Sequence, residues 1–176
     1  GSIAPLEDCY DPKLFPGSDI ASNEFFTLAT WLVEEGADAI ILETMNSINE
    51  TLAALKVLQS FNLPVYVSYH LKTPTHLPSG ESLNNALSIL NDFNISALLF
   101  NCSPISVIQK AVDNIVDTYD SIWGIYPNLG REAPSPNGII NETISDDIFL
   151  SVMQKCVDNG ATIAGGCCGA SPHHIA

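Results

Sequence analysis

Three cysteines occupy positions at which side chains can do chemistry. Cys102 follows an apolar run at 97–100, and Cys167 and Cys168 follow a second run at 161–164. In parallel α/β folds the working residues lie at the carboxyl ends of strands, so we expect these three thiols on one rim of the fold. Three thiolates suit a tetrahedral zinc ion whose fourth position stays open, an arrangement typical of catalytic sites.

The glycines around the cysteine pair agree with this interpretation. Gly165, Gly166 and Gly169 allow the backbone to turn so that both side chains can point at one ion. Adjacent cysteines can also form a vicinal disulfide or fill a core as small apolar side chains. Cys156 lies in a helical pattern and is expected in the core, whereas Cys9 has no evident partner in an N-terminal loop.

Other polar residues fall on or near the same rim. Glu43 ends a buried apolar run, where it could hold a cationic group of a substrate or only stabilise the start of the next helix. His70 and His76 lie in or near a loop, and we expect both to be solvated. His173 and His174 fall in the first turn of the last helix, where we expect no metal role.

The elements that must position these residues alternate regularly. We expect strands at 37–42, 64–69, 97–100, 121–126 and 161–164, and helices at about 23–35, 47–60, 82–93, 104–118 and 146–159, with another starting at 171. A turn-rich segment at 127–145 separates two of them. This alternation predicts a parallel α/β sheet with right-handed crossovers, and no change in composition marks a second domain within 1–176.

Two architectures fit five such units. One is a complete doubly wound sheet, and the other is part of a (β/α)8 barrel, which needs about 250 residues. The chain begins in a loop with no expected strand ahead of its first helix, and it ends inside a helix. Both ends therefore look cut, which favours the barrel fragment. Neither of the glycine-rich nucleotide-binding motifs is present.

Charge and composition exclude several function classes. Twenty acidic and six basic residues give a formal net charge of −14, which argues against nucleic acid and against anionic membranes as partners. The sequence shows no signal peptide and no apolar run of membrane-spanning length. An odd count of five cysteines without an export signal predicts a reducing, cytoplasmic location.

Five ordered segments resemble the homocysteine S-methyltransferase family. The segment 165–175 is similar to that family's closing G-G-C-C-x-x-x-P-x-H-I signature. The shorter matches are Gly1-Ser2-Ile3-Ala4-Pro5 for a G-S-x-x-P loop, Leu42-Glu43-Thr44 for L-E-T, Asn101-Cys102 for N-C and Tyr126-Pro127-Asn128 for Y-P-N. Together they cover nearly the whole chain.

The resemblance implies a (β/α)8 TIM barrel, of which this chain holds the C-terminal five β/α units. It implies zinc held by Cys102, Cys167 and Cys168, with Glu43 binding the amino group of homocysteine. The reaction would transfer a methyl group to the homocysteine thiol and give methionine. Without an attached cobalamin or folate domain, S-methylmethionine or S-adenosylmethionine is favoured as the donor.

The chain also departs from the family. The N-terminal part of the barrel is absent, including an aspartate-glycine element of the substrate pocket, and Met45-Asn46 stands where relatives commonly carry Ile-Pro. Two alternatives therefore stay open. The chain could be an inactive fragment that keeps a structural zinc site, or a thiol redox protein that uses Cys167 and Cys168. The sequence predicts no oligomeric state.

Overall fold

One parallel sheet organises the molecule in the computed structural model, which describes residues 1–116, 119–130, 140 and 142–175. Its six strands follow the chain in order: β1 (Ser2–Ile3), β2 (Ile40–Met45), β3 (Val65–Tyr69), β4 (Ala97–Pro104), β5 (Trp123–Asn128) and β6 (Ile163–Ala164). The helices are α1 (Ser18–Glu34), α2 (Ile48–Leu58), α3 (Leu83–Leu90), α4 (Ile105–Ile115), α5 (Asp146–Asp158) and α6 (Pro172–Ile175), with a 3-10 turn at Pro12–Leu14. The predicted alternation is confirmed.

The first strand corrects the expectation that the chain begins without one. Ser2 and Ile3 pair in parallel with Ile41 and Leu42, so the described residues hold six strands rather than five. A two-residue strand is too short to leave a periodic pattern in the sequence. The strands β2 and β5 also extend further than expected, to Met45 and Asn128. Much of the predicted turn-rich segment, 131–139 and 141, lies outside the described residues.

Helix boundaries follow local side-chain chemistry. Ser47 caps α2 by accepting a hydrogen bond from the Glu50 N–H at 3.3 Å, and Ser82 caps α3 in the same way. Gly36 follows the end of α1 with φ at 91°, a conformation that costs glycine little. These boundaries leave short connections, which keep successive strands adjacent and parallel.

The two faces of the sheet differ in what covers them. One face is sealed by helices, and its fully buried side chains are Ile40, Leu42, Val67, Leu98, Phe100 and Ile125. On the opposite face, Ile41, Glu43, Tyr66 and Tyr126 are only half-buried. Because side chains alternate along a strand, this open face carries the polar residues near the strand ends.

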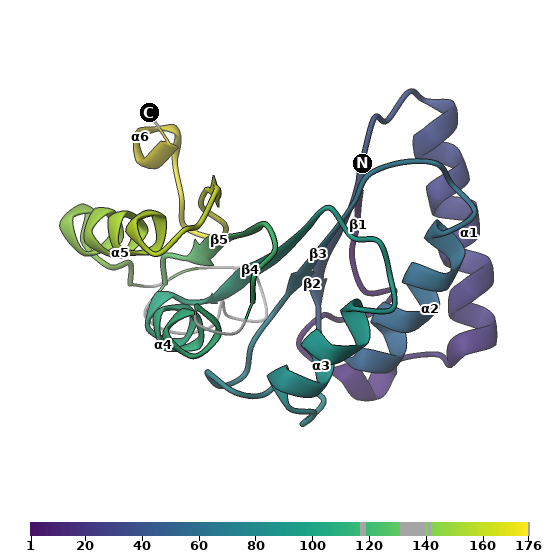
Figure 1. The fold of residues 1–176 in the computed structure, drawn as a ribbon, viewed down its shortest axis with the longest axis horizontal. Helices are drawn as coiled ribbons and strands as arrows, with labels where there is room; N and C mark the ends of the chain where they lie inside the picture. The colour runs from purple at the N-terminus through teal and green to yellow at the C-terminus, as the bar shows by residue number, and fades with distance from the viewer. Residues whose placement is uncertain (117–118, 131–139, 141, 176) are drawn as a thin grey trace.

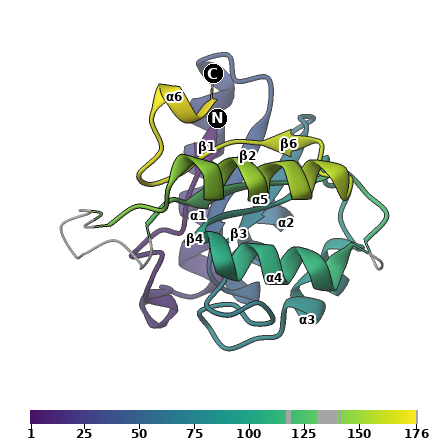
Figure 2. The same ribbon diagram turned by 90° about the vertical axis from the view of Figure 1, so that its left-hand side faces the viewer.

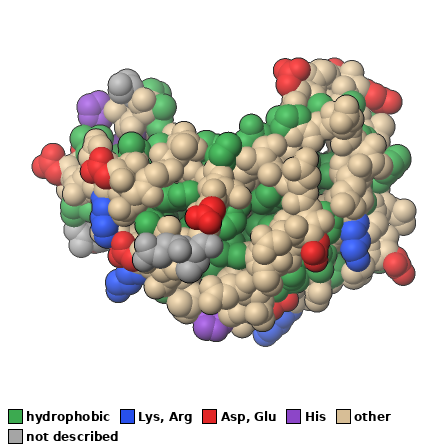
Figure 3. All heavy atoms as spheres, in the orientation of Figure 1, with side chains coloured by type: hydrophobic (Ala, Val, Ile, Leu, Met, Phe, Trp, Pro, Cys, Tyr) green, Lys and Arg blue, Asp and Glu red, His purple; other side chains and the backbone are tan. Residues whose placement is uncertain are grey.

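The figures show this arrangement directly. Helices α1 to α5 lie on one side of a bent sheet in Figure 1, and α4 and α5 lie side by side in Figure 2. The surface is hollowed between α6 and the end of α1, and hydrophobic side chains gather along the hollow in Figure 3. None of the described helices combines the length and hydropathy needed to span a bilayer.

Candidate metal centre

Three thiols meet at the carboxyl end of the sheet. The sulfur atoms of Cys102, Cys167 and Cys168 all lie within 4.8 Å of one another, and those of Cys102 and Cys168 are 3.5 Å apart. All three are free thiols. A tetrahedral zinc ion with Zn–S bonds of about 2.3 Å places its sulfur ligands about 3.8 Å apart, so these residues fit the ion. Within the described residues no other group of histidines, cysteines and carboxylates has this geometry.

An unusual backbone conformation aims the first of these thiols. The register of β4 shifts between Asn101 and Pro104, and Cys102 has a φ of 53°. Left-handed backbone is uncommon for residues other than glycine, and it persists where surrounding contacts hold it. Thr44, at the end of β2, has a φ of 59° and sits at a similar shift in register. The two strand ends are therefore distorted in the same way.

The side chain of Asn101 joins these distorted ends. Its Oδ1 accepts the Thr44 N–H at 3.1 Å and the Ser68 hydroxyl at 2.6 Å, and its Nδ2 donates to Thr44 Oγ1 at 2.7 Å. Asn101 is fully buried. One amide thus links β2, β3 and β4 at the level of the thiols, immediately before Cys102.

The cysteine pair lies on a loop that is bonded to β5. Cys167 N–H donates to the Pro127 carbonyl, and the Leu129 N–H donates to the Cys168 carbonyl, each at 2.9 Å. The glycine expectation is confirmed in part. Gly169 has a φ of 82°, and a Cβ at Gly166 would lie 2.5 Å from the Ala170 Cβ, whereas Gly165 has room for a side chain.

The last helix is attached to the helix before it. His173 Nε2 and His174 Nε2 lie 3.2 and 3.3 Å from the two carboxylate oxygens of Asp146, at the start of α5. His174 Nδ1 also contacts the Ser171 hydroxyl at 2.9 Å. These histidines belong to no three-residue metal group among the described residues, and they hold the segment that follows the cysteine pair.

The thiols differ in their readiness to ionise. A hydrogen bond from Cys102 lowers the pKa of Cys167 to about 6, against the effect of burial. The same hydrogen bond and burial raise the pKa of Cys102, and burial raises that of Cys168. One thiolate therefore forms readily, and a divalent cation would displace the protons that the other two retain.

Glu43 lies beside this cluster rather than at a helix start. Its Oε2 accepts a hydrogen bond from the Ser2 hydroxyl at 2.8 Å, and its charge opposes ionisation of Cys167. The start of α2 is served by other groups, since Ser47 caps it and Glu81 Oε2 accepts the Ile48 N–H at 2.8 Å. This geometry does not place Glu43 at a helix start, and a substrate contact stays a prediction for this residue.

Tyr126 interacts with both Glu43 and Cys167. Burial, followed by interactions with Glu43 and Cys167, raises the pKa of its phenol. The hydroxyl oxygen is buried. Tyr126 and Glu43 project from the same open face of the sheet, so polar groups lie near the three thiols.

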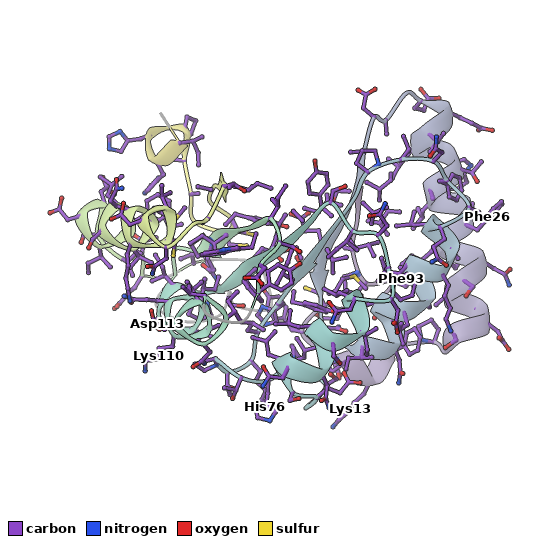
Figure 4. All side chains as sticks on the ribbon, in the orientation of Figure 1. Lys13, Phe26, His76, Phe93, Lys110 and Asp113 are labelled. Atoms are coloured by element: carbon purple, nitrogen blue, oxygen red, sulfur yellow. The ribbon has the colours of Figure 1, made fainter. Side chains whose placement is uncertain are left out.

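His70 corrects the expectation of a solvated loop histidine. It is only 7% exposed, and its Nδ1 lies 3.2 Å from the Ser103 hydroxyl. His76, by contrast, is exposed and points away from the molecule in Figure 4. The loop after β3 folds back over the sheet, with the Leu71 N–H donating to Ser103 Oγ at 2.7 Å, and this long-range contact could not be read from the sequence.

The burial of His70 predicts a loss of stability in acid. Burial lowers its pKa to about 4 from the ordinary 6.5, so below pH 6.5 the unfolded chain binds a proton that the folded chain does not. The free energy of unfolding should fall by about 3 kcal/mol between about pH 6.5 and 4. Chemical denaturation across this range should show a flatter profile for His70→Gln, while His76→Gln should keep the parent slope. Equal slopes in parent and His70→Gln would contradict this assignment.

Two residues at the site escaped sequence analysis. Tyr10 places its hydroxyl 3.2 Å from the Cys102 sulfur, and Ser2 bonds Glu43. Cys9 also approaches the cluster, since Cys167 and Cys168 contribute to raising its pKa to about 11, after burial and Asp8. No periodic pattern marks loop residues such as Tyr10 and Cys9, or a strand as short as β1. Cys156 is buried in α5, as expected.

Comparison with known proteins decides the family. The family model described as homocysteine S-methyltransferase matches residues 1–176. The chain belongs to the homocysteine S-methyltransferase family. Homocysteine S-methyltransferase 2 of Arabidopsis thaliana is 30% identical over 149 residues, which cover 82% of this chain and 45% of that protein. Homocysteine S-methyltransferase YbgG of Bacillus subtilis is 25% identical, with 82% and 46% covered. The chain thus spans about half the length of these curated relatives.

A solved structure of the family has the same fold. The metallated form of the homocysteine methyltransferase MmuM from Escherichia coli superposes with a TM-score of 0.81 at 22% identity, covering 99% of this chain and 58% of that one. The apo form of the same protein gives a TM-score of 0.77. This likeness identifies the six-stranded sheet as part of a TIM-barrel-type fold and confirms the barrel over the doubly wound alternative.

Proposed function

We propose that this chain carries the zinc-binding part of a homocysteine S-methyltransferase. The observation that carries the proposal is the cluster of Cys102, Cys167 and Cys168 with Glu43 beside it, toward the carboxyl ends of β2, β4 and β6. Family membership over residues 1–176 supports homocysteine as the methyl acceptor. Because the three thiols must stay reduced to bind a metal, the proposal includes a reducing compartment, the cytoplasm.

The three cysteines would hold zinc and leave its fourth position to the substrate. Zinc bound there would lower the pKa of the homocysteine thiol, so that the thiolate is available at neutral pH. The Cys102 thiolate projects from β4, and the Cys167 and Cys168 thiolates project from the loop after β6. Their positions fix where the substrate sulfur can lie. No side chain near the cluster needs to act as a general base, since the thiol proton can leave to solvent.

Glu43 would orient the other end of the substrate. Its residue is half-buried, its carboxylate accepts a hydrogen bond from the Ser2 hydroxyl at 2.8 Å, and its charge acts on Cys167. A carboxylate placed in this way can accept hydrogen bonds from an ammonium group. Glu43 and the thiols together therefore match the two ends of homocysteine, an amino acid with a terminal thiol.

The reaction would be a displacement at a methyl carbon. The homocysteine sulfur forms a bond to the methyl group, the bond from that carbon to the sulfonium sulfur of the donor breaks, and a neutral thioether leaves. Positioning the two sulfur atoms in line supplies most of the catalysis in such a step. We propose S-methylmethionine or S-adenosylmethionine as the donor, both of which carry the required sulfonium.

Replacement of Glu43 by glutamine tests this proposal. Zinc-loaded chain should bind homocysteine and form methionine from one of the two donors, and Glu43→Gln should raise the KM for homocysteine about 10- to 100-fold, as expected for losing a charge-assisted hydrogen bond. Calorimetric binding and methionine assays measure both. Glu24→Gln, at an exposed site on α1, is the matched control.

Two results would contradict the proposal. If folded, zinc-loaded chain neither binds nor methylates homocysteine, the metal has only a structural role. If homocysteine binding is the same in the parent and in Glu43→Gln, the carboxylate does not contact the amino group. A disulfide between Cys167 and Cys168 in protein without metal would support the thiol redox alternative.

A further inference from the structure

The segment that precedes the first turn is held against the site from two sides. The Leu6 N–H donates to Glu50 Oε1 at 2.8 Å, and Glu50 is only 2% exposed. Asn46 Nδ2 donates to the Cys9 carbonyl at 3.2 Å. Buried polar groups of this kind must keep their partners, so the segment 6–10 has a fixed path over the carboxyl ends of the strands.

Local bonds then orient Tyr10 at the end of this segment. Its N–H donates to Asp8 Oδ1 at 2.8 Å, and the Asp11 N–H donates to the Asp8 carbonyl at 3.0 Å, which together form a tight turn. The Tyr10 ring contacts the ring of His70 edge to face, with centroids 5.1 Å apart. His70 is itself buried, so the ring rests against a fixed surface.

The hydroxyl of Tyr10 reaches the metal cluster. Its oxygen lies 3.2 Å from the Cys102 sulfur, within the range of a hydrogen bond to sulfur. A thiolate that binds a metal carries no proton, so in that state the phenol must be the donor and the sulfur the acceptor. Phenols keep their proton at neutral pH, so the hydroxyl can fill this role.

We propose that Tyr10 is a positioning residue of the metal centre, which donates a hydrogen bond to the Cys102 thiolate. This inference rests on the proposed function, because it requires Cys102 to be a zinc ligand. The bond fixes the direction of the sulfur lone pairs and withdraws negative charge from a sulfur that shares its ion with two other thiolates. Groups that orient metal ligands in this way commonly change metal affinity 10- to 100-fold when they are removed.

Tyr10→Phe tests the inference because it removes the hydroxyl and keeps the ring against His70. In competition with a chromophoric chelator, the variant should bind zinc about 10-fold more weakly than the parent. With Co²⁺ in place of zinc, the sulfur-to-cobalt absorption should move to longer wavelength, since a thiolate without its hydrogen bond gives up electrons more easily. A merely structural effect would not move that band. Tyr66→Phe, on β3, is the matched control and should change neither quantity.

Two further measurements make the outcome decisive. The Tyr10 side chain is 39% exposed, so the metal-free variant should unfold at the same temperature as the parent. Cys102→Ala should lose the metal. If it does, and Tyr10→Phe keeps both the parent affinity and the parent cobalt band, the Tyr10 inference is overturned while the proposed function stands. If Cys102→Ala keeps its zinc, the proposed metal centre itself fails.

Discussion

Asn101→Ala is expected to lower the free energy of unfolding by about 3 kcal/mol, because each buried group left without its partner costs about 1 to 3 kcal/mol. The fully buried amide of Asn101 forms hydrogen bonds with the Thr44 N–H, the Thr44 hydroxyl and the Ser68 hydroxyl. Thr44 and Ser68 are themselves buried. For a chain of this size, the loss corresponds to a fall of about 10 °C in unfolding temperature.

The same substitution should also loosen the metal centre. Cys102 holds a left-handed backbone conformation directly after Asn101, and Thr44 holds another on the neighbouring strand. Without the amide that links them, both residues can relax toward ordinary strand geometry, and the Cys102 sulfur would turn away from the other two thiols. We therefore expect zinc affinity to fall together with stability.

Thermal unfolding and chelator competition measure the two effects. Asn84→Ala, at an exposed position on α3, is the control and should change the free energy of unfolding by less than about 0.5 kcal/mol. An Asn101→Ala variant that unfolds at the parent temperature would show that the amide does not hold these strand ends. If the variant is less stable but binds zinc with the parent affinity, Asn101 supports the fold without positioning the Cys102 sulfur.

Much of the site follows from one rule applied to the sequence. Cys102 and Cys168 are far apart along the chain, yet both follow apolar runs, and parallel strands bring their carboxyl ends to one edge. The structure places their sulfur atoms 3.5 Å apart. Hydrophobic patterning was sufficient for Cys102 because β4 is a long buried strand, which leaves a strong signal. The strand before the cysteine pair, β6, has only two residues, and there the loop glycines marked the turn.

The residues that orient the site could not be predicted in the same way. Tyr10 and His70 lie in loops whose paths depend on contacts with distant residues, such as Glu50 and Ser103. A loop sequence carries no period, and its conformation is fixed by hydrogen bonds that form only in the folded chain. For the same reason, the pairing of the two-residue strand β1 left no mark in the sequence.

Glu43 shows what the structure adds to an ambiguous residue. The sequence allowed either a substrate contact or a helix-initiating charge. The hydrogen bonds of α2 go to Ser47 and Glu81, and Glu43 turns to Ser2 and the thiol cluster instead. The choice depends on where competing side chains lie, which one sequence does not reveal.

Cys102→Ala and Cys168→Ala are each expected to abolish stable zinc binding. Zinc in a site of three protein ligands loses one third of its protein bonds when a thiolate is removed, and the two remaining thiols cannot complete a tetrahedral set. Cys156 provides the matched control, since it is a cysteine of the same chain that is buried in α5 away from the cluster. Cys156→Ala should therefore keep its metal.

The zinc content of the purified, reduced chain tests the central claim most directly. Elemental analysis should find about one zinc per chain in the parent and in Cys156→Ala, as expected for a three-thiolate site. It should find almost none in Cys102→Ala and Cys168→Ala. Folded parent protein that takes up no zinc, or cysteine variants that keep it, would contradict the assignment of Cys102, Cys167 and Cys168 as one metal centre.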